Sequence, residues 1–294
     1  MANARAIVKR RKAVKNTRKI TRTMQLIATA RYQQALQRAV GTRPYTEKIR
    51  ELVAQLTGTV EAVDDPLLRT EPVANRDAVL VLTSDRGFCG GYNANLLRKA
   101  VEQSEATAEP GRETDLHVVG KKGIAFFGFM GRELASQTID IDHRPRFEDV
   151  AAMADGFLDQ FRNEKIDALY VVYMRFISVG RQVPEVTTLL PLQPVETSDD
   201  DQATGASTER QYEFTPDPAV LLAELLPQTV KVQLFQCFND AAVSEQVARM
   251  VAMKAATDAA GDMIKSLSQQ YNRARQTQIT MELLDIMGGA EAIK

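Results

Sequence analysis

The residues best suited to chemistry lie in one glycine-containing segment, Ser84 to Asn93 (Ser-Asp-Arg-Gly-Phe-Cys-Gly-Gly-Tyr-Asn). An apolar run from Ala78 to Ser84 leads into it and is typical of a buried strand, and a helical pattern follows it. A loop between a strand and a helix can present backbone N–H groups and a helix N-terminus to a phosphate. The segment therefore has the location of a nucleotide-binding loop.

The spacing within this segment does not match a nucleotide-binding motif. It contains neither G-x-x-x-x-G-K-[ST] nor G-x-G-x-x-G, and it has no lysine. Cys89 lies near Asp85 and could act as a nucleophile, but the sequence offers no base beside it. A structural turn or a partner contact is the favoured interpretation, and a nucleotide-dependent enzyme is the alternative. We expect no catalytic residue and no bound cofactor.

Other candidates for catalysis or metal binding are few. The two histidines are His117, in a predicted strand, and His143, in a predicted loop. A zinc site needs three or four ligands. Cys89 and Cys237 are far apart and form neither a disulfide framework nor a zinc motif. We therefore expect no metal site, two buried thiols in a reducing compartment and a core-packed His117.

Charge is distributed unevenly along the chain. Of the 37 lysines and arginines, 12 lie between Met1 and Thr46, where there is no acid, so the remainder carries 25 basic and 38 acidic side chains. The run Lys9 to Lys12 could bind nucleic acid, form a solvated helix face or meet an acidic protein partner. Cations occur around the whole helix, which favours a protein partner. The segment superficially resembles a mitochondrial transit peptide, but it continues into a helix of the fold.

Long helices are predicted at both ends of the chain. The first runs from Ala4 to about Gly58, with Gly41 and Pro44 as its interruptions. The second begins at Asp217 and Pro218 and ends at Gly288. About 60 residues at 1.5 Å each give a rod of roughly 90 Å. A compact domain of this size spans only about 40 Å, so we expect the helix to project.

Apolar residues recur at helical spacing along both helices. In the first helix the repeat drifts between faces, which predicts an imperfect seam through Ile20, Met24 and Ile27, then Ala28, Tyr32, Ala35 and Ala39, then Ile49, Leu52, Leu56 and Val60. In the second helix the repeat steps by four and three through Ala260, Ile264, Leu267, Tyr271 and Ala274. Neither stripe can stand alone in water. We expect a long antiparallel two-helix coiled coil, with alanines allowing close approach.

The middle of the chain alternates predicted strands and helices, which indicates a Rossmann-like α/β domain with a mostly parallel five-stranded sheet. The strands are 78–84, 116–120, 137–142, 168–176 and 183–192, and the helices are 93–103, 124–130 and 147–162. The predicted organisation is a shaft helix over 1–60, an α/β domain over 75–196, a mobile acidic loop over 197–211 and a second shaft helix over 217–288. No apolar run reaches the roughly 20 residues of a membrane helix, so no direct membrane insertion is expected.

Several segments together resemble the gamma subunit of F-type ATP synthases. They are Ile7–Arg11, Lys15–Met24 (Lys-Asn-Thr-Arg-Lys-Ile-Thr-Arg-Thr-Met), Arg43–Tyr45, Asp85–Asn93, Ser244–Ala259 (Ser-Glu-Gln-Val-Ala-Arg-Met-Val-Ala-Met-Lys-Ala-Ala-Thr-Asp-Ala), Tyr271–Gln276 and Ile279–Leu283. Phe88 and Tyr92 depart from this pattern, since leucine is common at both positions. The resemblance covers essentially the whole chain.

The resemblance implies a central rotor shaft that couples proton flow to ATP synthesis or hydrolysis. The paired end helices would turn inside a ring of alpha and beta subunits. The α/β domain would be a foot that contacts the epsilon subunit and the membrane c-ring. The protein would be a non-catalytic, peripheral subunit on the cytoplasmic face of a bacterial inner membrane, without a nucleic-acid partner.

The resemblance also assigns individual residues to partner contacts. Met24, with Lys19 and Arg22 nearby, would meet acidic loops of the beta subunit. Coupling positions on the C-terminal helix would be Arg249, Gln276, Thr280 and Glu282. The foot would use Asp85, Arg86, Gly87, Cys89, Gly90 and Gly91 toward epsilon and the c-ring. The tip, Met281 to Ile293, would turn in an apolar sleeve. No regulatory cysteine pair of the chloroplast type is present, so no thiol switch is expected.

Overall fold

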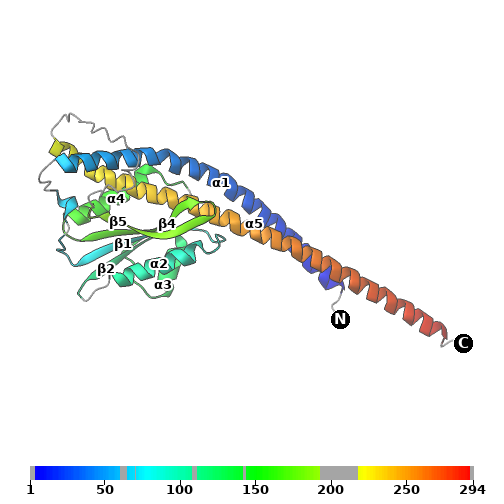
Figure 1. The fold of residues 1–294 in the computed structure, drawn as a ribbon. Coiled ribbons are helices and arrows are strands. Elements are labelled where there is room, and N and C mark those ends of the chain that lie inside the picture. Colours follow the sequence, from blue (N-terminus) through cyan, green and yellow to red (C-terminus); the bar gives the residue numbers. More distant parts are fainter. Residues whose placement is uncertain are drawn as a thin grey trace. The chain divides into compact units, whose positions relative to one another are not determined.

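The computed structural model describes residues 4–59, 65–69, 71–107, 111–141, 144–192 and 218–291. It divides into two compact units. One unit contains residues up to Ala30 together with those from Arg249 onward, and the other spans Arg31–Ala248. We call them the outer unit and the α/β unit. The helices α1 (Ala4–Thr59, 56 residues) and α5 (Pro218–Glu291, 74 residues) contribute to both (Figure 1).

The outer unit consists of the outer parts of α1 and α5 in antiparallel contact. The guanidinium of Arg11 lies 5.2 Å from the centre of the Tyr271 ring, and Thr257 Oγ1 donates a hydrogen bond to Thr21 Oγ1 at 2.9 Å. The numbering therefore rises along one helix as it falls along the other. The seam on α5 follows the predicted steps of four and three: Met253, Thr257, Ala260 and Leu267 are buried, and Ile264, Tyr271 and Ala274 are half-buried.

The seam on α1 follows the prediction at most positions: Ala28, Ala35, Ala39, Ile49 and Leu56 are buried, and Met24, Tyr32 and Leu52 are half-buried. Ile20 and Ile27 are 60 % and 48 % exposed, so they lie off the seam. One set of inward positions recurs every seven residues: Ile7, Val14, Thr21, Ala28, Ala35, Thr42, Ile49 and Leu56, of which Val14 and Thr42 are half-buried. Thr21 lies inward where Ile20 was expected, because small side chains let two helix backbones approach closely. The repeat is that of a regular coiled coil.

The α/β unit is built on a five-stranded sheet of order β3-β2-β1-β4-β5. Its strands are β1 (Arg76–Leu82), β2 (Glu113–Val119), β3 (Ser136–Thr138), β4 (Ala168–Ser178) and β5 (Arg181–Leu190). All neighbouring pairs are parallel except β4 and β5. The predicted mostly parallel five-stranded sheet is therefore confirmed. The order reverses beside β1, as in doubly wound nucleotide-binding sheets.

Helices cover both faces of this sheet (Figure 1). One face carries α2 (Tyr92–Ala106) and α3 (Lys121–Phe129), and the other carries α4 (Phe147–Arg162) and α5. Alternate residues of β1 point to opposite faces: Leu80 packs in the core under α4 and α5, whereas Val81 packs under α2 and α3. This alternation follows from the two-residue period of a strand.

The inner parts of α1 and α5 belong to the core of the α/β unit. Between Leu222 and Val247 most positions of α5 are buried, which a coiled-coil stripe alone would not produce. Ala35 and Ala39 of α1 pack with Phe176 of β4 and with Val243 of α5. The helix α1 continues through Pro44, and α5 continues past Gly288 to Glu291. The predicted acidic loop 197–211 lies outside the described residues.

Candidate functional site

The glycine-containing segment follows β1 at the carboxyl end of the parallel strands and holds the start of α3. The amide of Lys121 donates to Asp85 Oδ1 at 3.0 Å. The next two amides of α3 donate to Ser84 O at 3.1 Å and to Thr83 Oγ1 at 2.9 Å. These are the amides that a helix N-terminus would otherwise offer to an anion. The chain's own oxygen atoms therefore satisfy the first three amides of α3.

The same segment is closed internally around Cys89. Asn93 Nδ2 donates to Ser84 Oγ at 2.8 Å and to Cys89 Sγ at 3.3 Å. Cys89 is 2 % exposed, whereas Phe88 is 72 % exposed and has a left-handed φ of 62°. Cys89 thus lies inside the closed loop, whereas Asp85 ties the loop to α3. The role of Thr83 could not be predicted from the sequence, because its partners Val119 and Gly123 come from other elements.

The six residues predicted to contact a partner through this loop fall into a group at the loop surface and a group engaged within the protein. Arg86, Gly90 and Gly91 are exposed and Gly87 is half-buried, so these four can meet a partner at the loop surface. Asp85 is half-buried and engaged with α3, and the Cys89 thiol lies inside the loop. A contact of this loop with epsilon or the c-ring stays a prediction.

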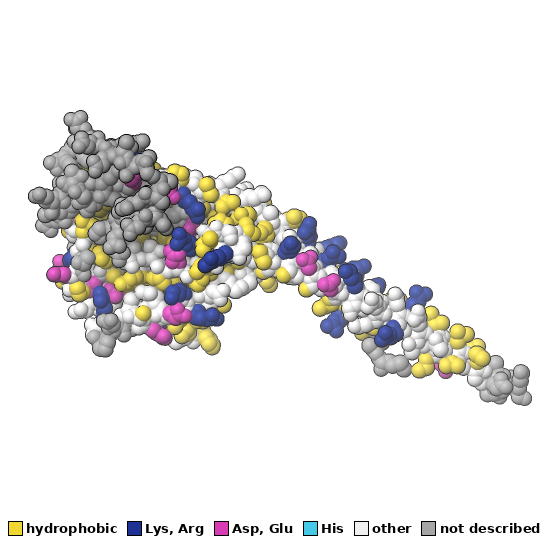
Figure 2. Space-filling model, viewed as in Figure 1, with side chains coloured by type: hydrophobic (Ala, Val, Ile, Leu, Met, Phe, Trp, Pro, Cys, Tyr) yellow, Lys and Arg dark blue, Asp and Glu magenta, His cyan; other side chains and the backbone are white. Residues whose placement is uncertain are grey.

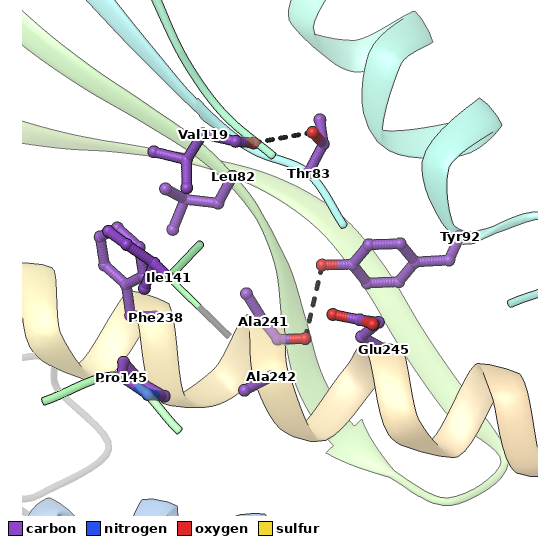
Figure 3. Close-up of a pocket in the computed structure, with 10 residues that line it drawn as sticks. All are labelled: Leu82, Thr83, Tyr92, Val119, Ile141, Pro145, Phe238, Ala241, Ala242 and Glu245. Carbon is purple, nitrogen blue, oxygen red and sulfur yellow. Dashed lines mark hydrogen bonds between the residues drawn. The ribbon is translucent and has the colours of Figure 1, made fainter. Parts of the chain in front are cut away.

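The crevice where doubly wound sheets bind nucleotides is filled by α5. Ser244 Oγ donates to the carbonyl of Met174 at 3.0 Å, and Tyr92 OH lies 3.4 Å from the carbonyl of Ala241. A cavity of about 30 Å³ remains there (Figure 3). Its lining is Leu82, Thr83, Tyr92, Val119, Ile141, Pro145, Phe238, Ala241, Ala242 and Glu245. Small-molecule sites usually measure about 300–1,000 Å³. This cavity lies far below that range, so the crevice of the sheet gives no support to the nucleotide-enzyme alternative.

The cationic candidates of the outer unit lie on its surface. Lys19 and Arg22 are exposed, and Arg22 Nη1 donates to Gln25 Oε1 at 3.0 Å. Met24 is half-buried beside them. Figure 2 shows lysine and arginine side chains gathered along this unit. The arrangement suits contact with an acidic surface, because the charges are solvated and lie close together.

The candidates on α5 fall into two environments. Gln276, Thr280 and Glu282 are exposed, and Glu282 Oε1 accepts from Gln278 Nε2 at 2.9 Å within the helix. Arg249 is only 8 % exposed, so it does not project toward a partner from the single chain. Its predicted coupling role would have to act through the packing around it.

The last described turns of α5 are apolar yet exposed. Every position from Gln276 to Gly289 is exposed. The large apolar side chains there are Ile279, Met281, Leu283, Leu284, Ile286 and Met287, each between 46 % and 69 % exposed. Figure 2 shows this apolar surface toward the C-terminal end of the chain. Contiguous exposed apolar surface of this kind indicates a binding partner.

The remaining chemical groups are part of the core. His117 Nδ1 and Ser136 Oγ lie 2.7 Å apart, and the ring packs edge-on against Phe157. Burial lowers the pKa of His117, although the charge of Asp115 opposes this shift. His143 lies outside the described residues. In the described part of the chain, no group of three His, Cys, Asp or Glu side chains could hold a metal ion, and no helix has the length and apolarity to span a membrane.

Comparisons with known proteins cover the whole chain. A family model described as ATP synthase matches residues 3–293. The chain is 47 % identical over 295 residues to the ATP synthase gamma chain of Rhodopirellula baltica, and 40 % identical over 293 residues to that of Leptospira biflexa. Each of these alignments spans all of both proteins.

Solved structures share the fold. A chain of the Euglena gracilis mitochondrial ATP synthase, from an OSCP/F1/c-ring structure, aligns with a TM-score of 0.66 at 17 % identity, covering 99 % of this chain and 94 % of that chain. A chain from the central stalk and c-ring of the Tetrahymena thermophila enzyme aligns with a TM-score of 0.57 at 20 % identity, covering 81 % of this chain and 99 % of that chain.

Proposed function

The chain belongs to the ATP synthase gamma-chain family, and from that premise we propose that it is the central rotor shaft of an F-type ATP synthase. It transmits rotation between the membrane c-ring and the catalytic alpha–beta hexamer, and so couples proton flow to ATP synthesis or hydrolysis. The observation that carries the proposal is the full-length match to gamma chains in a protein whose end helices pair in antiparallel contact.

The surface of the outer unit supports contact with the alpha–beta hexamer. Lys19 and Arg22 would meet acidic loops of beta, with Met24 beside them. The exposed apolar end from Met281 onward would turn inside an apolar sleeve. Gln276 and Thr280 precede this end and Glu282 lies within it; all three are exposed and can contact the same partners. A few mobile charged contacts along a rotating helix would keep friction low.

The α/β unit would serve as the foot. We propose that it contacts epsilon and the c-ring, with Arg86, Gly87, Gly90 and Gly91 at the loop surface. The protein is a subunit of the ATP synthase complex and associates peripherally with the membrane. We propose further that it contributes no catalytic group and that it lies on the cytoplasmic face of a bacterial inner membrane.

The test reverses the shaft cations in the assembled complex. Lys19→Glu combined with Arg22→Glu would replace two attractive contacts with repulsive ones. Exposed charge pairs contribute up to about 1 kcal/mol each, and 1.4 kcal/mol corresponds to about tenfold in rate. We therefore expect ATP-driven proton pumping in membrane vesicles to fall by up to about thirtyfold, the value reached if both contacts contribute about 1 kcal/mol. Lys165→Glu, at an exposed position of the α/β unit, is the matched control.

The outcomes distinguish the proposed contact of Lys19 and Arg22 from the proposed rotor role of the protein. Unchanged pumping in the double variant would contradict the placement of Lys19 and Arg22. A tagged chain that purifies without alpha, beta, epsilon or c subunits would contradict the rotor proposal itself. Micromolar ATP affinity of the isolated chain would favour the enzyme alternative.

A further inference from the structure

A chain of polar side chains joins α1 to α5 inside the α/β unit. Thr42 Oγ1 donates to Gln236 Oε1 at 2.8 Å, and Gln236 Nε2 donates to Asp240 Oδ1 at 3.0 Å. The guanidinium Nη2 of Arg43 lies 3.8 Å from the same carboxylate oxygen. Two adjacent residues of one helix are thus tied to two residues one turn apart on the other.

The bonds have a defined direction. A carboxylate only accepts hydrogen bonds, so the amide of Gln236 must turn its NH₂ group toward Asp240. Its oxygen then faces Thr42, which must donate. Thr42 Oγ1 also lies 3.2 Å and 3.1 Å from the carbonyls of Arg38 and Ala39, which are the alternatives for its single proton. The contact with Gln236 is the one that leaves the helix.

Thr42 occupies a seam position of α1 where an apolar residue would be ordinary. It belongs to the seven-residue repeat that includes Ala35 before it and Ile49 after it, both buried. In coiled coils, a single polar residue at such a position specifies register at a cost in stability. The contact of Thr42 with Gln236 therefore lies where a polar residue can specify the register of the two helices.

The Asp240 carboxylate, the last of these linked polar side chains, adds little favourable energy by itself. The Asp240 side chain is 8 % exposed, and burial raises the pKa of its carboxyl. Arg43 from α1 and Arg175 from β4 oppose that shift, and Glu185 from β5 adds to it. A buried charge pair is weak evidence for stability, and in some systems such groups fix structural specificity.

We propose that Thr42, Arg43, Gln236 and Asp240 form a register clamp that fixes the axial position of α1 against α5 in the α/β unit. A slip of one repeat moves a helix by about 10 Å. Gln236 would then face Ala35 or Ile49, neither of which has a side chain that can bond to it. The slipped arrangement would leave the half-buried Gln236 amide oxygen without Thr42 and the buried Asp240 carboxylate without Arg43, while the bond between Gln236 and Asp240 within α5 would remain. The two lost contacts therefore favour one register.

The outer unit contains an independent contact of the same type. Thr21 is a seam position of the same repeat on α1, and its hydroxyl accepts a hydrogen bond from Thr257 of α5 at 2.9 Å. Both side chains are buried. A helix pair that transmits force along its length needs such contacts, because purely apolar stripes can slide. The inference concerns the helix pair and holds for the full chain whatever its partners.

The test measures register directly in the full chain. Spin labels on Gln37→Cys and Gln228→Cys, two exposed positions on α1 and α5, report the distance between the helices. Cys89 and Cys237 are 2 % and 5 % exposed, so they should label slowly in the folded protein. We expect one narrow distance distribution. With Thr42→Val and Gln236→Leu added, we expect it to broaden or to gain a second maximum shifted by about 10 Å.

The control is Thr229→Val, because the buried Thr229 hydroxyl donates to the carbonyl of Leu225 within its own helix. The distance distribution of this control should match that of the protein that carries only the two spin labels. If the double variant does not fold, the single variant Thr42→Val decides the question. An unchanged distribution in the folded clamp variant, even with a lower Tm, would overturn the proposal. Equal broadening in the Thr229→Val control would also overturn it.

Discussion

The carboxylate of Asp167 offers the sharpest stability test in the α/β unit. Its side chain is 2 % exposed, and Oδ1 accepts from the amides of Val73 and Ala74 at 2.8 and 2.9 Å. Oδ2 accepts from the amide of Arg76 at 3.3 Å. These bonds hold the chain that enters β1. Burial alone would raise the pKa of Asp167, but the backbone donors outweigh burial and lower the pKa below its ordinary value.

Asp167→Asn removes one acceptor and introduces a donor in its place. The amide oxygen can keep the bonds to Val73 and Ala74, but its NH₂ group must then face the amide of Arg76. Hydrogen bonds to charged groups contribute about 1.5–3 kcal/mol, and two facing donors add a further cost. We expect the free energy of unfolding to fall by roughly 2–4 kcal/mol. The Tm should fall by roughly 5–12 °C.

The pH dependence identifies the charge as the cause. A carboxyl whose folded pKa is depressed stabilises the fold above its unfolded pKa of about 3.9, and that contribution is lost as the pH falls through the folded pKa. Urea unfolding followed by circular dichroism should therefore show the largest difference between wild type and Asp167→Asn at pH 7. The difference should shrink below about pH 4. A difference that stays constant down to the lowest pH where both proteins fold would refute this reasoning. Asp159→Asn, at an exposed position, should change stability by less than about 0.5 kcal/mol.

Two further substitutions test close packing in each unit. Gly120→Ala would place a Cβ 2.3 Å from the carbonyl oxygen of Thr83 at a φ of +98°, whereas Gly131→Ala, at a φ of +67°, meets nothing within 4 Å. We expect thermal unfolding to show that the free energy of unfolding falls by at least about 3 kcal/mol in Gly120→Ala and by about 1 kcal/mol in Gly131→Ala. Equal losses in the two variants would contradict the predicted clash. Thr257→Val removes the buried bond to Thr21, and limited proteolysis of the outer helices should show about 1 kcal/mol less protection; unchanged protection would mean that the bond is energetically neutral.

The regular elements followed from local sequence pattern. The helix predicted over 147–162 has those bounds in the structure, and each predicted strand overlaps an observed one. These segments carry strong periodicity and clear breaks, so local information was sufficient. The helix ends were less predictable. Gly288 and Gly289 form a natural stop, yet α5 continues to Glu291.

At two positions of α1, Ile20 and Ile27, the seam could not be predicted from hydrophobicity alone. Isoleucines at positions 20 and 27 are more apolar than their neighbours Thr21 and Ala28, but the neighbours are buried. Inside a close helix pair, a small side chain fits and a hydroxyl can be satisfied by its counterpart, as Thr21 is by Thr257. The partner helix therefore decides which stripe is inward, and that partner is more than two hundred residues away in sequence.

The glycine-containing segment shows that a motif can be assigned a chemistry only when its contacts with other elements are known. Its residues stand between a strand and a helix, as a phosphate-binding loop would. The contacts that decide its role come from elsewhere: Thr83, Ser84 and Asp85 bond to the first amides of α3, and Ala241 to Ser244 of α5 pass through the crevice. A helix that fills the nucleotide position of a doubly wound sheet is anchored by both the sheet and α2. The fold therefore uses its ligand-binding crevice to hold the inner part of α5, which is what a domain attached to a force-bearing helix requires.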